Sequence, residues 1–280
     1  MATEKLKKGE INKRDLEHIN LNDIKLIATD MDGTLLDSEK NLPPDFLNWV
    51  NTHKDIKTVL ASGRQYFTLK NMFHSVEDDV IFVAENGAIV FEKGEILYCN
   101  KISREDVVRC LELLDGKPGI ALILCGAKSA YMKHGSDLVE ENGHMYYAKL
   151  QFVEDLYECL DMDDMVKIAV FVEEQKAEPV WKGLPELGEN LLAVLSGDSW
   201  IDIANKSVSK GEAIEVIQKR LNITRQQSMA FGDYLNDYDL LCQCEESYAM
   251  ENAHPKLKKI AKHITDSNDE QGVMKVLNRF

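Results

Sequence analysis

Three carboxylates could form one reactive site. Asp30 and Asp32 stand two residues apart within KLIATDMDGTLL, residues 25–36, and Asp233 follows another short apolar run far along the chain. Converging carboxylates repel one another unless a cation holds them, and an all-oxygen ligand set suits Mg²⁺. Magnesium with open positions in turn suits phosphate, and an ionised carboxylate attacks phosphorus without a base. We therefore expect phosphoryl-transfer chemistry, with Asp30 as nucleophile and Asp32 as the acid and base.

Phosphoryl oxygens also need hydrogen-bond donors and positive charge. Ser62 offers a hydroxyl, the Gly63 amide lies beside it, and Lys210 at the start of a predicted helix supplies a cation. Asn236 is a candidate donor to the substrate or a residue that holds its loop. Asp237 is expected to orient Lys210 or a metal-bound water.

Each motif also has a purely structural interpretation. Asp-x-Asp-Gly occurs in turns and in calcium loops, but an EF-hand register begun at Asp30 places Leu35 where glycine belongs and Asn41 where the bidentate glutamate belongs. Lys210 alone could be a solvated surface residue, and an Asx turn with a helix cap explains part of the segment 232–237. The catalytic interpretation is favoured because each motif directly follows an apolar run or opens a helix.

The elements around these residues predict an α/β fold. Short apolar runs that end in a turn predict buried strands near residues 26–30, 56–61, 80–84 and 228–231. A helix is expected from about residue 43 to 53 between the first two strands, which gives the βαβ unit of a parallel sheet. Helices are also expected over 211–221, 254–261 and 272–277. A doubly wound sheet of this kind presents its chemistry at the carboxyl ends of its strands.

The middle of the chain has a different pattern. Strand-like segments at 88–91 and 95–98 flank Lys93-Gly94, which indicates a hairpin. Helical stretches at 104–114 and 174–187 alternate with strand-like runs at 120–124, 130–133, 166–172, 191–195 and 200–203, as in an α+β domain. We therefore predict a charged N-terminal extension (1–22), a Rossmann-like core (23–88 and 205–280) and an inserted α+β domain (89–204).

Composition narrows the class of protein. The 280-residue chain is 44% hydrophobic, enough for one large or two modest domains, and its net charge of −15 argues against a nucleic-acid partner. Apolar stretches such as 81–84 and 166–172 fall far short of the roughly 20 residues of a membrane span. Six scattered cysteines fit a reduced compartment. We expect a cytoplasmic protein, a monomer or weak homo-oligomer, that acts on a small phosphorylated metabolite without a membrane partner.

Taken together, the motifs resemble the haloacid dehalogenase superfamily, and within it the Cof-like phosphatases with a large C2-type cap. The resemblance runs from about Lys25 to Val276. The matching elements are DMDGTLL at Asp30, SGR at Ser62, ENGA at Glu85, SKGEA at Ser209, FGDYLND at Phe231, and AMENAHPKLKKIAKHIT with the following NDEQGV at Asn268. Departures are small: Glu251 stands where many relatives have glycine.

The resemblance implies a ligand set and a division of labour. Mg²⁺ would be bound by the Asp30 carboxylate, the Asp32 carbonyl and Asp233. The residues implied to hold the phosphate are Ser62, Gly63, Lys210 and Asn236. The inserted domain would be the cap that selects the leaving group, commonly a sugar phosphate and sometimes a flavin or pyridoxal phosphate.

Three functions are open on the sequence. The first is a Mg²⁺-dependent phosphatase that works through an aspartyl-phosphate, and the second is a phosphomutase on sugar phosphates. The third is a non-catalytic phosphate- or metal-binding protein, which the complete set of Asp30, Asp32, Lys210 and Asp233 argues against. Candidate contacts to the leaving group are Arg64, Asn86, Tyr131, His134 and Trp200.

Overall fold

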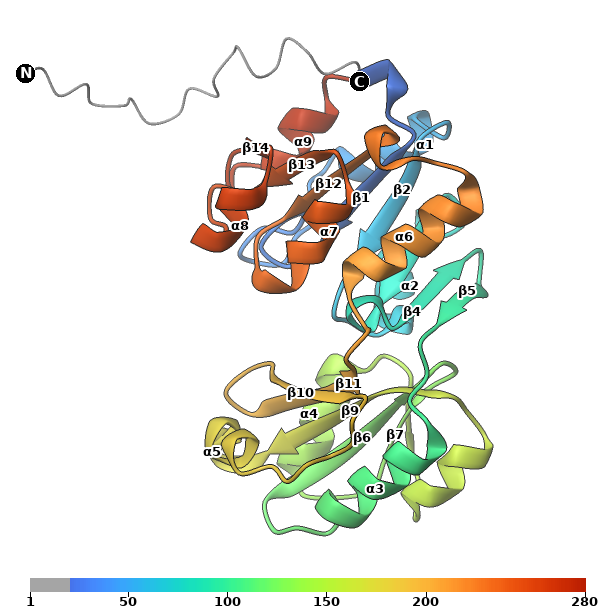
Figure 1. Cartoon of the computed structure of the whole chain (residues 1–280), viewed down its shortest axis with the longest axis vertical. Coiled ribbons are helices and arrows are strands. Elements are labelled where there is room, and N and C mark those ends of the chain that lie inside the picture. The colour runs from blue at the N-terminus through green and yellow to red at the C-terminus, as the bar shows by residue number, and fades with distance from the viewer. Residues whose placement is uncertain (1–20) are drawn as a thin grey trace, which may run out of the picture. The chain divides into compact units, whose positions relative to one another are not determined.

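The computed structural model describes residues 21–280 (Figure 1), so the predicted extension over residues 1–22 lies almost wholly outside the described residues. Contacts divide the described chain into two compact units. Unit 1 comprises residues 21–61, 78–81 and 214–280, and unit 2 comprises Ser62–Glu77 and Phe82–Ala213. The predicted domain boundaries at residues 88 and 205 stay a prediction.

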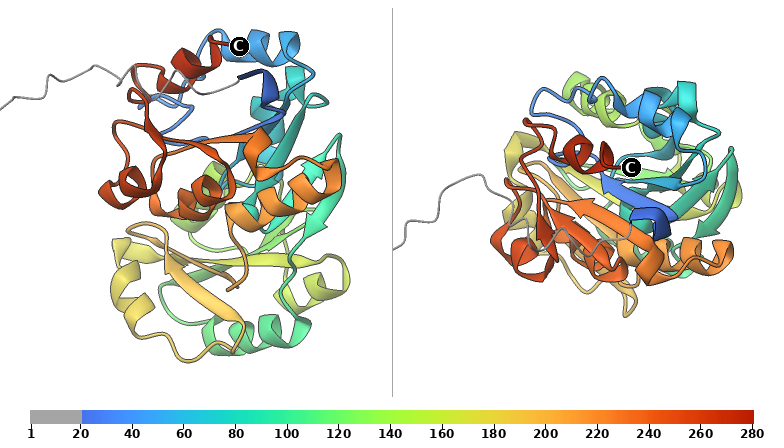
Figure 2. Two further views of the ribbon diagram at one scale, coloured as in Figure 1. Left: turned by 45° about the horizontal axis from the view of Figure 1, so that its top comes forward. Right: turned by 90° about the horizontal axis from the view of Figure 1, so that it is seen from above.

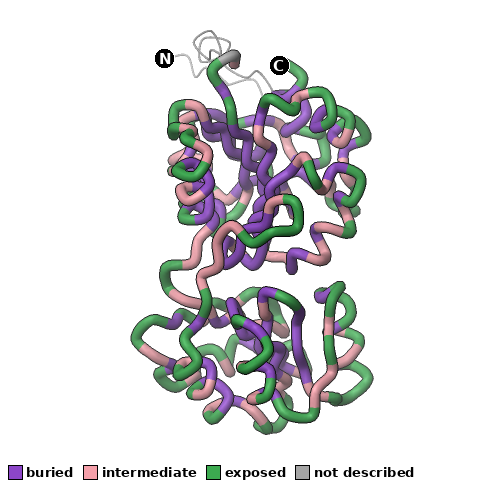
Figure 3. The backbone as a smooth tube through the Cα atoms, turned by 90° about the vertical axis from the view of Figure 1, so that its right-hand side faces the viewer, coloured by how far each residue is buried: buried purple, intermediate pink, exposed green. Residues whose placement is uncertain are grey.

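Unit 1 contains parallel strands in the order β14-β13-β12-β1-β2. Their bounds are β1 Leu26–Asp30, β2 Lys57–Ala61, β12 Ser228–Gly232, β13 Glu246–Ala249 and β14 His263–Ile264. Every residue of β1 and β12 is buried, as expected for continuous apolar runs in a parallel sheet. Figure 3 shows the buried residues along the inner segments of the backbone and the exposed residues in the outer ones. In the register, Thr29 lies beside Phe231, so β1 and β12 end nearly level.

Helices cover both faces of these strands. They are α1 Phe46–Thr52, α6 Lys210–Leu221 (of which residues from 214 belong to unit 1), α7 Tyr238–Gln243, α8 Pro255–Ile260 and α9 Gly272–Leu277, with the short 3₁₀ helices η1 Leu21–Asp23, η6 Arg225–Gln227 and η7 Leu235–Asp237. Figure 2 shows α1 and α9 on one face and α6 to α8 on the other. The indole of Trp49 on α1 donates a hydrogen bond to the Leu277 carbonyl of α9, which ties the first helix to the last. The predicted doubly wound α/β fold is confirmed.

Unit 2 begins with α2 Tyr66–Met72 and η2 His74–Val76, followed by β3 Val80–Ala84 from residue 82 on, η3 Glu85–Gly87, β4 Ile89–Glu92 and β5 Glu95–Cys99. Strands β4 and β5 pair antiparallel as the predicted hairpin. The positive φ angles of Lys93 and Gly94 form its turn.

A second sheet in unit 2 has the order β10-β11-β9-β6-β7-β8, antiparallel except for the parallel pair β7–β8. Its elements are α3 Arg104–Leu114, β6 Ile120–Gly126, β7 Ala130–Met132, α4 Asp137–Tyr146, β8 Leu150–Phe152, η4 Leu156–Asp161, β9 Met165–Val172, η5 Glu173–Gln175, α5 Ala177–Lys182, β10 Leu191–Leu195 and β11 Trp200–Asn205. One hydrophobic cluster packs α3 against this sheet, and a second contains Val139 of α4. This arrangement confirms the predicted α+β pattern of the insertion.

No helix within residues 21–280 combines the length and the apolar character that crossing a membrane requires.

Candidate active site

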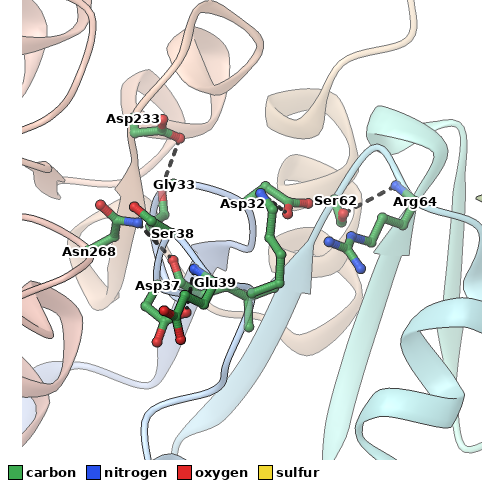
Figure 4. Close-up of polar contacts among 12 residues, drawn as sticks. Asp32, Gly33, Asp37, Ser38, Glu39, Ser62, Arg64, Asp233 and Asn268 are labelled. Carbon is green, nitrogen blue, oxygen red and sulfur yellow. Dashed lines mark hydrogen bonds and ion pairs between the residues drawn. The ribbon is translucent and has the colours of Figure 1, made fainter.

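Asp30 is the last residue of β1 and is 6% exposed, because the strand that carries it is buried on both faces. The chain then turns sharply, with the Leu36 amide donating to the Met31 carbonyl at 2.9 Å. Asp32 lies in this turn, and its carboxylate pairs with Lys40 Nζ at 2.9 Å (Figure 4). Both partners are partly exposed, so water screens this ion pair and leaves Asp32 accessible.

Three carboxylates converge beside the end of β1. Oxygen atoms of Asp30, Asp233 and Asp237 all lie within 4.8 Å of one another. Asp237 is fully buried, and its Oδ2 accepts hydrogen bonds from the amides of Asp233 at 3.0 Å and Tyr234 at 3.2 Å. The Thr34 hydroxyl donates to Asp233 Oδ1 at 3.1 Å. Such a concentration of hard oxygen donors fits Mg²⁺, since a cation relieves their mutual repulsion.

Gly33 and Gly232 allow this convergence. A Cβ atom on Gly33 would lie 2.4 Å from Asp233 Oδ2, and one on Gly232 would lie 2.6 Å from the Asp237 Cβ. Gly33 also has a φ angle of +80°, which disfavours other residues. Gly33 therefore makes room for the carboxylate of Asp233, and Gly232 makes room for the side chain of Asp237.

Two asparagines from the C-terminal part of the chain hold the loop after β1. Asn252 Nδ2 donates to the Gly33 carbonyl at 2.8 Å, and Asn268 Nδ2 donates to the Leu36 carbonyl at 3.0 Å. The Asn268 amide donates in turn to Asn252 Oδ1 at 3.1 Å. Figure 4 shows Asn268 beside this loop together with Ser38, whose amide and hydroxyl donate to Asp269. The sequence motifs contain these residues, but nothing in their spacing indicates this role.

In unit 2 the structure brings Ser62, Gly63 and Lys210 to one turn. The Ser62 amide donates to the Val83 carbonyl of β3 at 2.9 Å, and its Oγ accepts from the Arg64 amide (Figure 4). Ser62 is 2% exposed, and Lys210 is fully buried at the start of α6. The Ser62 carbonyl accepts a hydrogen bond from the Asn86 amide of η3, and the backbone of Lys210 lies against Gly87 of the same turn.

The remaining site predictions lie in unit 1, where Asn236 is an exposed residue of η7. Asp30, Asp32, Asp233, Asn236 and Asp237 thus belong to unit 1, whereas Ser62, Gly63 and Lys210 belong to unit 2. The contacts described above hold each of these two sets of residues in place within its own unit.

Two of the residues named as leaving-group contacts have structural partners. Tyr131 is 3% exposed within the α3 cluster, and its hydroxyl donates to Asp163 Oδ2 at 3.1 Å. His134 pairs with Glu140 at 2.9 Å. Trp200 remains partly exposed and packs against Phe171.

Nearly the whole chain is similar to known proteins. The family of haloacid dehalogenase-like hydrolases matches residues 27–277. The 5-amino-6-(5-phospho-D-ribitylamino)uracil phosphatase YbjI of Escherichia coli is 32% identical over 91% of this chain and 96% of its own length. The phosphatase YwpJ of Bacillus subtilis is 26% identical over 92% and 100%.

A solved structure from Streptococcus mutans is 31% identical, covers 91% of this chain and 98% of its own, and superposes with a TM-score of 0.75. The resemblance inferred from the motifs is thereby confirmed across nearly the whole chain. The chain belongs to the haloacid dehalogenase-like hydrolases, and like its relatives it is a phosphatase.

Proposed function

We propose that this protein is a Mg²⁺-dependent phosphatase that hydrolyses small phosphorylated metabolites, most often sugar phosphates, through an aspartyl-phosphate. The observation that carries the proposal is the convergence of Asp30, Asp233 and Asp237 at the ends of two buried parallel strands. Three acidic groups in so small and largely buried a space favour a bound divalent cation.

The proposed ligands of the ion are the Asp30 and Asp233 carboxylates and the Asp32 carbonyl, with Asp237 beside them. When bound, Mg²⁺ would neutralise phosphoryl oxygens and orient the phosphorus toward the nucleophile. Asp237 also fixes the turn that carries Asp233, because one of its oxygens accepts two backbone amides of that turn.

Asp30 and Asp32 carry out the two chemical steps. A carboxylate oxygen of Asp30 attacks phosphorus and the phosphorus–oxygen ester bond breaks, while Asp32, which must be protonated for this step, gives its proton to the leaving oxygen. Asp32 then takes a proton from water as that water attacks the aspartyl-phosphate, which releases phosphate and restores Asp30. The partial exposure of Asp32 supports this role, since the group must meet both the leaving oxygen and water.

Four residues are proposed to bind the phosphoryl group. Ser62 donates its hydroxyl, Gly63 its amide, Lys210 its ammonium and Asn236 its side-chain amide. Their positions after strands or at the starts of helices support this assignment.

The substrate class rests on a relative. The Escherichia coli relative is named for a substrate whose phosphate is attached to a ribityl chain, a sugar alcohol. A phosphate ester of a sugar or sugar alcohol is therefore the proposed substrate. The acidic composition and scattered cysteines support a cytoplasmic enzyme, a monomer or weak homo-oligomer, with no nucleic-acid or membrane partner.

A phosphate-release assay tests the proposal. Hexose phosphates, 5-amino-6-(5-phospho-D-ribitylamino)uracil, flavin mononucleotide and pyridoxal phosphate are incubated with the protein, with Mg²⁺ and with chelator. We expect Mg²⁺-dependent release that Asp30→Asn lowers by at least about 10³-fold, because the nucleophile is lost. The matched control is Asp55→Asn, which replaces an exposed carboxylate before β2. We expect this variant to retain activity.

Absence of release from every substrate, or an Asp30→Asn variant as active as the parent, would refute the phosphatase proposal. Isomerised sugar phosphate without net release would instead identify a phosphomutase.

A further inference from the structure

A buried lysine in unit 2 has no place in the chemistry described so far. Lys167 lies in β9, all eight residues of which are buried. Its Nζ lies 2.5 Å from Glu85 Oε2 and 3.6 Å from Asp202 Oδ2. The Glu85 side chain is 3% exposed and that of Asp202 is 21% exposed. An ammonium group is tolerated in such a place only when carboxylates compensate its charge, so this cluster specifies where Glu85 must lie.

Glu85 opens the Glu85–Gly87 turn, whose backbone is strained. The φ angles of Glu85, Asn86 and Gly87 are +50°, +57° and +104°. Glycine adopts such angles freely and asparagine often does, but glutamate rarely does, so the surroundings of Glu85 must impose its angle. The Glu85 amide donates to the Arg64 carbonyl at 3.1 Å, and its carboxylate is held by Lys167. The conformation at Glu85 therefore depends on the contacts that hold its amide and its carboxylate.

The same turn contacts both segments proposed to bind phosphate. The Asn86 amide donates to the Ser62 carbonyl at 2.9 Å, and a Cβ on Gly63 would lie only 3.0 Å from Asn86 Nδ2. A Cβ on Gly87 would lie 2.1 Å from the Ser209 carbonyl oxygen and 2.9 Å from the Lys210 nitrogen. Any shift of the turn therefore moves Ser62, Gly63 or the backbone of Lys210.

We infer that Lys167 is a positioning residue for phosphate binding. Through Glu85 it holds the Glu85–Gly87 turn, and the turn sets the positions of Ser62, Gly63 and Lys210. Lys167 lies in the segment 89–204 predicted as the insertion, so the insertion would contribute to binding the phosphoryl group that all substrates share. The inference rests on the proposed phosphatase function and extends it to a residue that does not touch the substrate.

The charges in the cluster are consistent with this role. Two carboxyl groups face one ammonium group in this cluster. Burial raises the pKa of the Glu85 carboxyl, and the attraction of Lys167 only partly offsets this. Burial lowers the pKa of Lys167, but Asp202 and Glu85 outweigh it and hold that pKa well above its usual value. Lys167 is therefore the charged member on which the cluster depends.

A competing role for Lys167 is direct contact with the leaving group. The two roles differ in which substrates they affect. A positioning residue acts on the phosphoryl group and influences every ester alike, whereas a leaving-group contact influences only esters that present the matching group. Comparison of p-nitrophenyl phosphate with a hexose phosphate separates them.

The test uses the full chain with Lys167→Met. We expect kcat/KM to fall roughly 10–100-fold for p-nitrophenyl phosphate and for a hexose phosphate alike, because displacing the binding groups by about 1 Å has effects of that size. The inhibition constant of inorganic phosphate is expected to rise as well. Lys182→Met is the matched control: it makes the same substitution at an exposed lysine of α5 that pairs with Glu178, and its kinetics are expected to stay within about twofold of the parent.

Lys167→Met leaves a carboxylate buried without its cation and threatens folding. The double variant Lys167→Met/Glu85→Gln removes both charges, so it carries the same kinetic test where the single variant does not fold. We expect the double variant to fold but to bind phosphate more weakly than the parent, because the pair of Lys167 and Glu85 no longer holds the turn in place.

Three other outcomes can be distinguished from the expected one. Loss confined to the hexose phosphate would assign Lys167 to the leaving group and overturn the inference. A lowered melting temperature with unchanged kcat, KM and phosphate inhibition would also overturn it, because the role would be structural. Parent protein that releases no phosphate from either ester would refute the proposed function instead. Calorimetric binding of inorganic phosphate would then still compare parent and variants.

Discussion

Replacing Gly33 by alanine should weaken metal binding by displacing Asp233. The new Cβ would lie 2.4 Å from Asp233 Oδ2 and 2.9 Å from its Cγ, well inside ordinary contact distance. The carboxylate must therefore move by about 1 Å, against the hydrogen bond that Thr34 donates to it. Mg²⁺ demands oxygen ligands at about 2.0–2.1 Å in near-octahedral geometry, so a displacement of this size removes a ligand or distorts its approach.

The chain contains a matched control for this substitution. Gly94, in the β4–β5 hairpin, has the same φ of +80°, but a Cβ there would meet nothing within 4 Å. Alanine at either position costs roughly 1–2 kcal/mol of left-handed backbone strain. The difference between Gly33→Ala and Gly94→Ala therefore isolates the effect on Asp233.

We expect Gly33→Ala to bind Mg²⁺ roughly 10–100-fold more weakly than Gly94→Ala, the size of effect seen when groups around a metal are displaced. Calorimetric titration with Mg²⁺ measures this directly, and phosphate release as a function of Mg²⁺ concentration measures its consequence. Urea unfolding checks that both variants lose similar stability. Equal Mg²⁺ affinity in the two variants would refute the assignment of Asp233 as a ligand.

Two further predictions follow from shifted pKa values. Burial raises the pKa of Glu246, but hydrogen bonds with His263 and Lys262 outweigh it and hold that pKa below its usual value of about 4.3. The ionised Glu246 contributes its full stabilisation above that value, and this contribution is lost as pH falls through the folded-state pKa. Between about pH 5 and pH 3 the free energy of unfolding, measured with urea, should therefore fall more steeply in the parent than in Glu246→Gln. Equal slopes in the two proteins would contradict this prediction. Cys242 is exposed, whereas burial raises the pKa of Cys125 to about 12. Iodoacetamide at neutral pH should therefore modify Cys242 first, as read by mass spectrometry, and equally fast native modification of Cys125 would contradict the structure.

The strands were the most predictable part of the fold, because burial on both faces demands an unbroken apolar run. Sequence ranges such as 80–84 and 166–172 agree with β3 and β9 within a residue. Helices in the insertion were less predictable. The expected helix over 174–187 is only Ala177–Lys182, since Glu174 and Gln175 adopt positive φ angles.

Helix α4 was not predicted, because its sequence is polar and contains Gly143. That glycine packs closely against β7: a Cβ there would lie 2.6 Å from Met132 Sδ, so the buried Met132 side chain would have to shift. Helical periodicity does not record such a tertiary contact. The helix does carry a local signal at its start, where Ser136 Oγ accepts the Val139 amide.

The sequence motifs predicted which residues form the candidate site better than they predicted which other residues contact them. The proximity of Asp30 and Asp233 follows from two parallel strands ending level, which sequence can suggest. The inclusion of Asp237 among the converging carboxylates depends on a 3₁₀ turn that its own oxygen caps. The support from Asn252 and Asn268 is beyond sequence reasoning, because both bind backbone carbonyls more than 200 residues away.

Lys167 shows that the sequence contained one signal that the motifs did not use. It interrupts an otherwise apolar run, MVKIAVFV, in a strand that proves to be fully buried. A lone lysine in such a run must find a carboxylate, because an unpaired buried ammonium is too unfavourable to persist. The partner could not be named from the sequence, since nothing in the run indicates that Glu85 begins a strained turn beside Ser62. The need for a carboxylate partner could nevertheless be read from the sequence, and in the structure that partner is Glu85 of the Glu85–Gly87 turn.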